Sequence, residues 1–132
     1  EEIPQPKLTL TFSASIVSSS LVKTIEDIKN VSDYIRISYL PAERAVEFYG
    51  DSEASNCKIK YESGDENLLQ VDGVETKASY NLSYLEDMAK KFTKISDVGK
   101  LALSNDMPLK ISSDNHEVGE LVYWLAPRIE AT

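Results

Sequence analysis

Few side chains in this sequence could carry catalysis. The one histidine, His116, stands among polar turn residues at positions 114–117, where an imidazole is usually just solvated. The one cysteine, Cys57, excludes an internal disulfide and favours a reducing compartment. These two residues cannot complete a zinc site, and a histidine-activated nucleophile would have to depend on His116. We therefore expect no metal site and no histidine-based catalysis.

Phosphate chemistry and simple nucleic-acid binding have little support either. The chain has five glycines and none of them cluster, so it lacks a glycine-rich phosphate loop. Its 22 acidic residues outnumber 14 basic ones and give a formal charge of −8, which disfavours tight DNA binding by the free chain. Because carboxylates can still pair in space, an acid–base enzyme stays a minor alternative. The main expectation is a protein with no enzymatic activity and no cofactor.

The first half of the chain shows one strand, one helix and three further strands. Residues 8–16 alternate strictly between apolar and polar, which predicts a half-buried strand. Next comes a stripe at helical spacing, with Ser18 or Ser19 as its cap: Val17, Leu21, Ile25 and Ile28. A hairpin is predicted from Tyr34–Leu40 and Ala45–Tyr49, followed by a strand over Ala54–Tyr61.

The second half repeats this order. A short strand, Leu68–Val71, is expected to turn at Asp72-Gly73 and pair with the chain from Val74, which begins a strand over Glu75–Leu82. Ser83 and Glu86 have the spacing of a capping box, and a helical stripe follows at Leu85, Met88 and Phe92. Three more strands are predicted: Val98–Ser104, Met107–Ser112 and Val118–Leu125.

These elements predict an α+β domain in which two helices cover one face of a curved antiparallel sheet. The strand, helix, three-strand order occurs over Lys7–Tyr61 and again over Glu75–Leu125, as a repeat of pattern rather than of residues. A length of 132 residues fits one domain. No apolar run approaches the roughly 20 residues that a membrane helix needs.

Two surface features point to interaction rather than chemistry. Lys23 lies opposite the first helical stripe, and Lys90 and Lys94 lie opposite the second, although an ordinary solvated face would look the same. Residues 121–129 form a strand that is apolar on both faces and ends in Ala-Pro. Its second face needs cover, either from a neighbouring element or from a partner that binds an exposed apolar patch.

Two segments closely resemble a known family. They are residues 105–109, Asn-Asp-Met-Pro-Leu, and residues 123–130, Tyr-Trp-Leu-Ala-Pro-Arg-Ile-Glu. Together they resemble the carboxyl-terminal half of sliding clamps of the proliferating cell nuclear antigen family, and Tyr84-Leu85 and Ile3-Pro4 fit as well. Arg128 in the second segment resembles archaeal members of the family more than eukaryotic ones. The resemblance implies the DNA-clamp fold, with residues 1–6 as the end of an interdomain connector, 7–127 as one clamp domain and 128–132 as a tail.

The function that the resemblance implies is that of a processivity factor without catalytic activity. A family subunit has two such domains, and three subunits form a ring around duplex DNA, without sequence preference. The ring tethers polymerase, clamp loader, flap endonuclease and ligase-type clients through short hydrophobic peptides. The implied location is the cytoplasm or nucleoid of an archaeon, or the nucleus of a eukaryote. The alternative is a stand-alone peptide-binding module of the same fold with no DNA role.

The resemblance also assigns three groups of residues. Client peptides are expected at Ile3, Pro4, Pro108, Trp124, Leu125, Ala126 and Pro127. DNA is expected to face Lys23, Lys90 and Lys94, with Lys91 at the edge. The strand at 54–61 should end its sheet with an unpaired edge, which in the family joins the next subunit. The implied interface consists of Asn56, Cys57, Lys58, Ile59 and Lys60, with Ile25 and Ile28 nearby.

Overall fold

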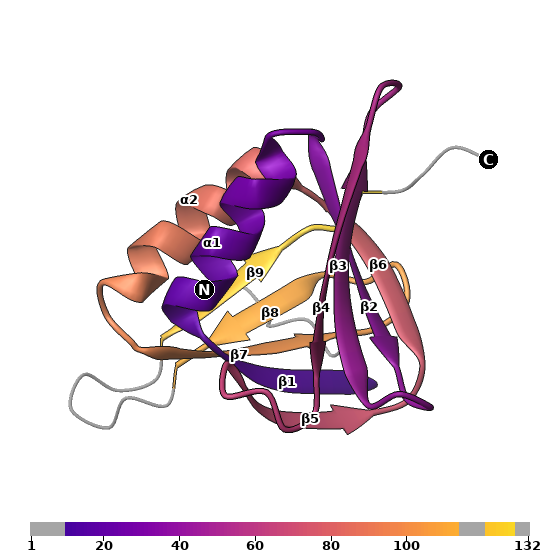
Figure 1. Cartoon of the computed structure of the whole chain (residues 1–132). Helices are drawn as coiled ribbons and strands as arrows, with labels where there is room; N and C mark the ends of the chain where they lie inside the picture. The colour runs from indigo at the N-terminus through magenta and orange to yellow at the C-terminus, as the bar shows by residue number, and fades with distance from the viewer. Residues whose placement is uncertain (1–9, 114–120, 129–132) are drawn as a thin grey trace.

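The structure, a computed structural model, describes residues 10–113 and 121–128. This part of the chain forms two helices and nine strands (Figure 1). In chain order they are β1 (Phe12–Val17), α1 (Ser18–Lys29), β2 (Tyr34–Leu40), β3 (Ala45–Asp51), β4 (Asn56–Glu62), β5 (Leu68–Gly73), β6 (Thr76–Asn81), α2 (Leu82–Thr93), β7 (Val98–Leu103), β8 (Leu109–Ser112) and β9 (Val122–Leu125). Neither helix is long and apolar enough to cross a membrane within this described part.

The predicted α+β class is confirmed. The strands form two antiparallel sheets, where the sequence predicted one curved sheet. Sheet A has the order β5-β1-β7-β8-β9, and sheet B has the order β4-β3-β2-β6. Each helix carries the chain from one sheet to the other, α1 from β1 to β2 and α2 from β6 to β7. The repeated strand–helix–strand order is therefore a repeated crossing between the sheets.

The core lies between the two sheets and the paired helices. Alternation in β1 buries Phe12, Ala14 and Ile16 and leaves the intervening residues half-exposed. The predicted stripes of both helices face the same core, with two exceptions. Val17 ends β1 instead of belonging to α1 and is half-exposed, and Met88 lies at the edge of the core. Phe12 of sheet A stacks on Tyr39 of sheet B with ring centroids 4.7 Å apart, which ties the sheets together.

The predicted helix caps are wrong at both helices. α1 begins after Val17, which makes no side-chain cap, and the Ser18 hydroxyl is buried without a partner among the described residues. At α2 the cap is Asn81, whose side-chain oxygen accepts the Tyr84 N–H at 3.1 Å. Ser83 and Glu86 lie inside the helix, so they form no capping box. Asn81 takes the role because the extended backbone of β6 ends there, two residues earlier than the spacing implied.

The predicted hairpin at Asp72-Gly73 is also wrong. β5 continues through these two residues and pairs with β1, so Gly73 lies opposite Phe12. Gly73 has φ +131°, and a Cβ there would lie 2.3 Å from the Thr11 carbonyl oxygen, so only glycine fits. The Val74 N–H donates to that same oxygen at 3.1 Å. The chain therefore passes from sheet A to sheet B instead of reversing on itself.

Candidate functional site

The two helices lie side by side and expose a layer of lysines (Figure 1). Lys23, Lys90, Lys91 and Lys94 are all exposed, as predicted. Carboxylates lie among them: Lys23 Nζ is 3.3 Å from Asp27, and Lys90 Nζ is 3.4 Å from Glu86 and 3.7 Å from Glu26. We name the exposed surface of α1 and α2, with the cap residue Lys94, the helix layer. These segments carry five lysines and four carboxylates, so the helix layer is close to neutral.

Glu86 joins the two helices, a role that no local sequence pattern predicted, since its place in a capping box is wrong. It accepts a 2.8 Å hydrogen bond from Lys29 of α1 and also pairs with Lys90 of its own helix. The hydrogen bond from Lys29 is the main reason why the pKa of Glu86 lies below its usual value, and the same bond raises the pKa of Lys29. The side chain of Glu86 is only 11% exposed, so the pair is held at the seam between the helices.

A second surface forms where the carboxyl-terminal strand leaves sheet A. β9 pairs with β8 so that Leu125 lies opposite Leu109, and Ala126 and Pro108 are the chain neighbours of this last pair. The chain then reaches sheet B, where the Arg128 N–H donates to the Ser79 carbonyl at 2.7 Å. Ala126 and Pro127 therefore bridge the two sheets. We name the exposed or half-exposed residues gathered here the apolar patch: Met107, Pro108, Ala126 and Pro127.

The buried phenol of Tyr80 supports this apolar patch. Tyr80 is fully buried, and its hydroxyl donates to the Met107 carbonyl at 2.7 Å. Burial, with a smaller effect of Asp106, raises the pKa of Tyr80, so the phenol stays protonated and remains a donor. Tyr80 and Met107 were not predicted as site residues, because the contact joins positions 27 apart and leaves no local pattern.

The predicted client residues do not all reach this surface. Trp124 is half-exposed on the outer face of sheet A, where Lys110 Nζ lies 5.9 Å from its ring centroid. Leu125 is 8% exposed, so it packs beneath the apolar patch and offers little surface to a partner. Ile3 and Pro4 lie outside the described residues, as does His116.

The third surface is the edge of sheet B. β4 ends the sheet and pairs, within the described chain, with β3 alone. Asn56, Lys58 and Lys60 are exposed, whereas Cys57 and Ile59 are half-buried and pack against the core. The predicted edge is confirmed, but two other predicted residues are not part of any surface. Ile25 and Ile28 are fully buried, because an apolar helical stripe faces its own core first.

The hydrogen-bond pattern shows which residues of β4 face outwards with their backbone. The Ser52 N–H donates to the Ser55 carbonyl at 2.8 Å, and the Ser63 N–H donates to the Arg44 carbonyl at 2.9 Å. Hydrogen-bonded pairs alternate with non-bonded pairs in an antiparallel ladder. Counting along β4, the backbone groups of Cys57 and Ile59 therefore bond to β3, and the unpaired groups at the edge belong to Asn56, Lys58 and Lys60.

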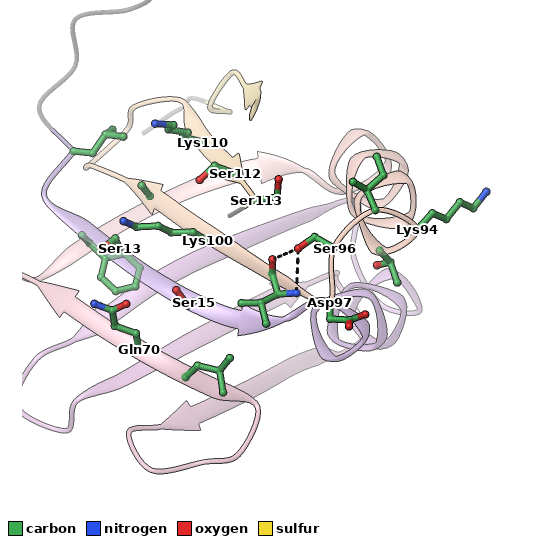
Figure 2. Close-up of a pocket in the computed structure, with 17 residues that line it drawn as sticks. Ser13, Ser15, Gln70, Lys94, Ser96, Asp97, Lys100, Lys110, Ser112 and Ser113 are labelled. Carbon is green, nitrogen blue, oxygen red and sulfur yellow. Dashed lines mark hydrogen bonds between the residues drawn. The ribbon is translucent and has the colours of Figure 1, made fainter. Parts of the chain in front are cut away.

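A hollow of about 1180 Å³ lies on the outer side of sheet A (Figure 2). Its lining is mostly polar and includes Ser13, Ser15, Lys100 and Lys110. Asp97 is the one carboxylate among the lining residues, so this hollow holds no acid–base pair. No group of three histidine, cysteine or acidic residues within 10–113 and 121–128 could hold a metal ion. The acid–base alternative gains no support from either observation.

Comparison with known proteins identifies the family of this chain. Residues 7–128 match the family described as proliferating cell nuclear antigen, C-terminal domain. The chain is 35% identical over 130 residues to the DNA polymerase sliding clamp of Thermococcus sibiricus, covering 98% of this chain and 51% of that protein. It is 29% identical over 131 residues to DNA polymerase sliding clamp 1 of Pyrobaculum aerophilum, covering 98% of this chain and 52% of that protein.

A solved structure shows the same fold. The crystal structure of PCNA from Thermococcus kodakaraensis superposes with a TM-score of 0.87 at 25% identity, over 97% of this chain and 52% of that chain. The chain thus spans about half the length of the relatives it matches.

Proposed function

The chain belongs to the proliferating cell nuclear antigen family as a C-terminal domain, and we propose that it acts as half of a subunit of a DNA polymerase sliding clamp. The role is non-enzymatic: a trimeric ring encircles duplex DNA and tethers replication and repair enzymes. The observation that carries the proposal is the placement of an exposed lysine-bearing helix layer beside an unpaired sheet edge. Because its relatives are archaeal, we place the protein in the cytoplasm or nucleoid.

The helix layer is suited to DNA that must slide. Contacts to phosphates carry no sequence information, so a few weak ones hold the duplex without fixing its position. Lys23, Lys90 and Lys94 would face the duplex, with Lys91 at the edge. Neighbouring carboxylates moderate their attraction, since Lys23 and Lys90 already make ion pairs. The acidic excess of the chain lies elsewhere and repels DNA from the other surfaces.

The apolar patch is suited to short hydrophobic peptides of client enzymes. A helical turn with aliphatic and aromatic anchors would lie on Pro108 and Pro127, with Trp124 beside it and Leu125 beneath. Ala126 is exposed and small, so a peptide backbone can approach and pair with this segment as an added strand. Ile3 and Pro4, at the end of the connector, would complete the site. Clients of this kind would include polymerase, clamp loader, flap endonuclease and ligase.

The edge of β4 is suited to assembly. Its outward backbone groups at Asn56, Lys58 and Lys60 could continue the sheet into the amino-terminal domain of the next subunit. Such a head-to-tail contact needs two different surfaces, and this chain supplies only the receiving one. The chain alone is therefore a monomer, with Lys58 and Lys60 opposing self-pairing.

The test of this function uses the chain joined to an amino-terminal clamp domain. The ring should be a trimer in light scattering and should be retained on circular DNA but lost from linear DNA, since a ring slides off a free end. Equal retention on both DNA forms would contradict encirclement. Client peptide binding without any retention on circular DNA would favour the peptide-binding module that has no DNA role.

A further inference from the structure

A cluster of arginines and tyrosines on the outer face of sheet B takes no part in the surfaces described so far. Tyr34 and Arg36 alternate along β2 with core residues, so they point away from the core. Arg36 lies opposite Tyr49 of β3, and its guanidinium carbon is 4.7 Å from that ring centroid. The guanidinium carbon of Arg128 lies 5.0 Å from the ring centroid of Tyr34. Two guanidinium groups thus lie over two neighbouring tyrosine rings.

One carboxylate fixes both rings. The Tyr34 hydroxyl donates to one oxygen of Asp51 at 2.7 Å, and the Tyr49 hydroxyl donates to the other at 3.1 Å. These two bonds, the one from Tyr34 foremost, lower the pKa of Asp51. Asp51 is therefore ionised and already occupied by the phenols. The rings are held in place, and the two guanidinium groups that they carry are held with them.

The guanidinium groups have donors to spare. Every ion pair within the described residues is made by a lysine, and neither Arg36 nor Arg128 makes one. The Nε of Arg36 is buried and donates to no described atom. A guanidinium stacked on a ring keeps its N–H groups in its own plane, where they match the two oxygens of a carboxylate. Ser79 lies between the two arginines on the sheet, since it is paired with Arg36 on one side and with Arg128 on the other.

We propose that Arg36 and Arg128 form a carboxylate-binding subsite, which receives an acidic side chain of a client peptide lying on the apolar patch. The inference rests on the proposed function. Arg128 directly follows Pro127 of the apolar patch, and its N–H is fixed to the Ser79 carbonyl at 2.7 Å. A residue that flanks the anchors of a peptide on the apolar patch would therefore lie close to Arg128. Encircled DNA lies on the helix layer, on the other side of the core, so its phosphates are not the ligand.

The experiment measures fluorescence anisotropy of peptides on the whole 132-residue chain. A peptide with aliphatic and aromatic anchors carries a single Glu at each flanking position in turn, and each Glu peptide is compared with its Gln counterpart. One position should bind about tenfold more tightly as Glu than as Gln, the ratio typical of one charge-assisted bonded pair. Arg36→Gln and Arg128→Gln should each remove this preference while leaving the Gln peptide's affinity unchanged.

Arg44→Gln is the matched control, since it removes the same charge at the opposite end of the β2–β3 hairpin. The Glu preference should survive it. Arg128 is exposed, so Arg128→Gln tests the subsite even where Arg36→Gln fails to fold. Equal affinity of Glu and Gln peptides at every position would overturn the subsite alone. Failure of the Gln peptide to bind would overturn the client site itself, and an oligonucleotide held through both arginines would replace the peptide as ligand.

Discussion

Tyr80→Phe removes one oxygen from the core and tests how the apolar patch is held. The lost hydroxyl donates to the Met107 carbonyl at 2.7 Å, and Tyr80 is fully buried. The carbonyl would lose its partner, and an unpaired buried polar group costs about 1–3 kcal/mol. Met107 is 41% exposed, so water can replace part of the bond. We therefore expect the free energy of unfolding to fall by about 1 kcal/mol.

Urea unfolding measures this loss, and a client-type peptide titration measures its effect on the apolar patch. Pro108 follows Met107, so a loosened carbonyl should also weaken peptide binding, by about twofold if half of that free energy is lost from the bound state. Tyr39→Phe is the matched control. Tyr39 is buried and packs on Phe12, but its hydroxyl makes no hydrogen bond within the described residues. Identical unfolding midpoints for Tyr80→Phe and Tyr39→Phe would refute the reasoning.

Four further predictions follow from the three surfaces. Ala126→Arg should abolish client peptide binding in a fluorescence titration with an unchanged circular dichroism spectrum, because the position is exposed. Glu86→Gln should flatten the acid limb of stability in urea titrations at several pH values. The pKa of Glu86 is lowered in the fold, so its contribution is present above the unfolded pKa and lost as pH falls through the folded one. In the two-domain protein, Lys58→Pro should weaken the trimer in light scattering yet spare the monomer, whereas Cys57→Pro should destabilise the monomer by removing a bond to β3. Loading on circular DNA should fall, with client binding unchanged, when glutamate replaces Lys23, Lys90 and Lys94.

Local patterns predicted the elements well and their partners poorly. β2 was predicted to the residue, because the turn that begins at Pro41 ends it. The division into two sheets could not be predicted, since alternation says which residues face a core but not which strand lies alongside. β5 is an example: Asp72-Gly73 has the composition of a hairpin turn, yet Gly73 is required by its close approach to Thr11, the residue before β1.

The site residues show the same contrast. Those in short motifs were predicted, and those that depend on contacts between distant positions were not. Ala126 and Pro108 were named from short motifs, and the structure places each of them directly beyond the last residues paired in one ladder, Leu125 and Leu109. Tyr80, which supports them, and Arg36, which lies beyond them, depend on contacts between distant positions and carried no signal of their own. Ile25 and Ile28 were predicted near the interface for a related reason. The family resemblance indicates where a surface lies, but both side chains are fully buried and do not reach it.

The alternation of hydrogen bonds along β4 indicates which residues a neighbouring subunit could bind. It does so more directly than the residue types do. The backbone groups of Cys57 and Ile59 bond to β3 and their side chains pack against the core, so the main-chain groups open to a partner strand are not theirs. A partner strand would meet the backbone of Asn56, Lys58 and Lys60, whose side chains stay exposed on the outer face. Lys60 already pairs with Glu43 at 2.6 Å, so its charge at this edge is partly neutralised. Pairing at this edge would therefore depend on main-chain bonds, with side chains deciding only which strand may approach.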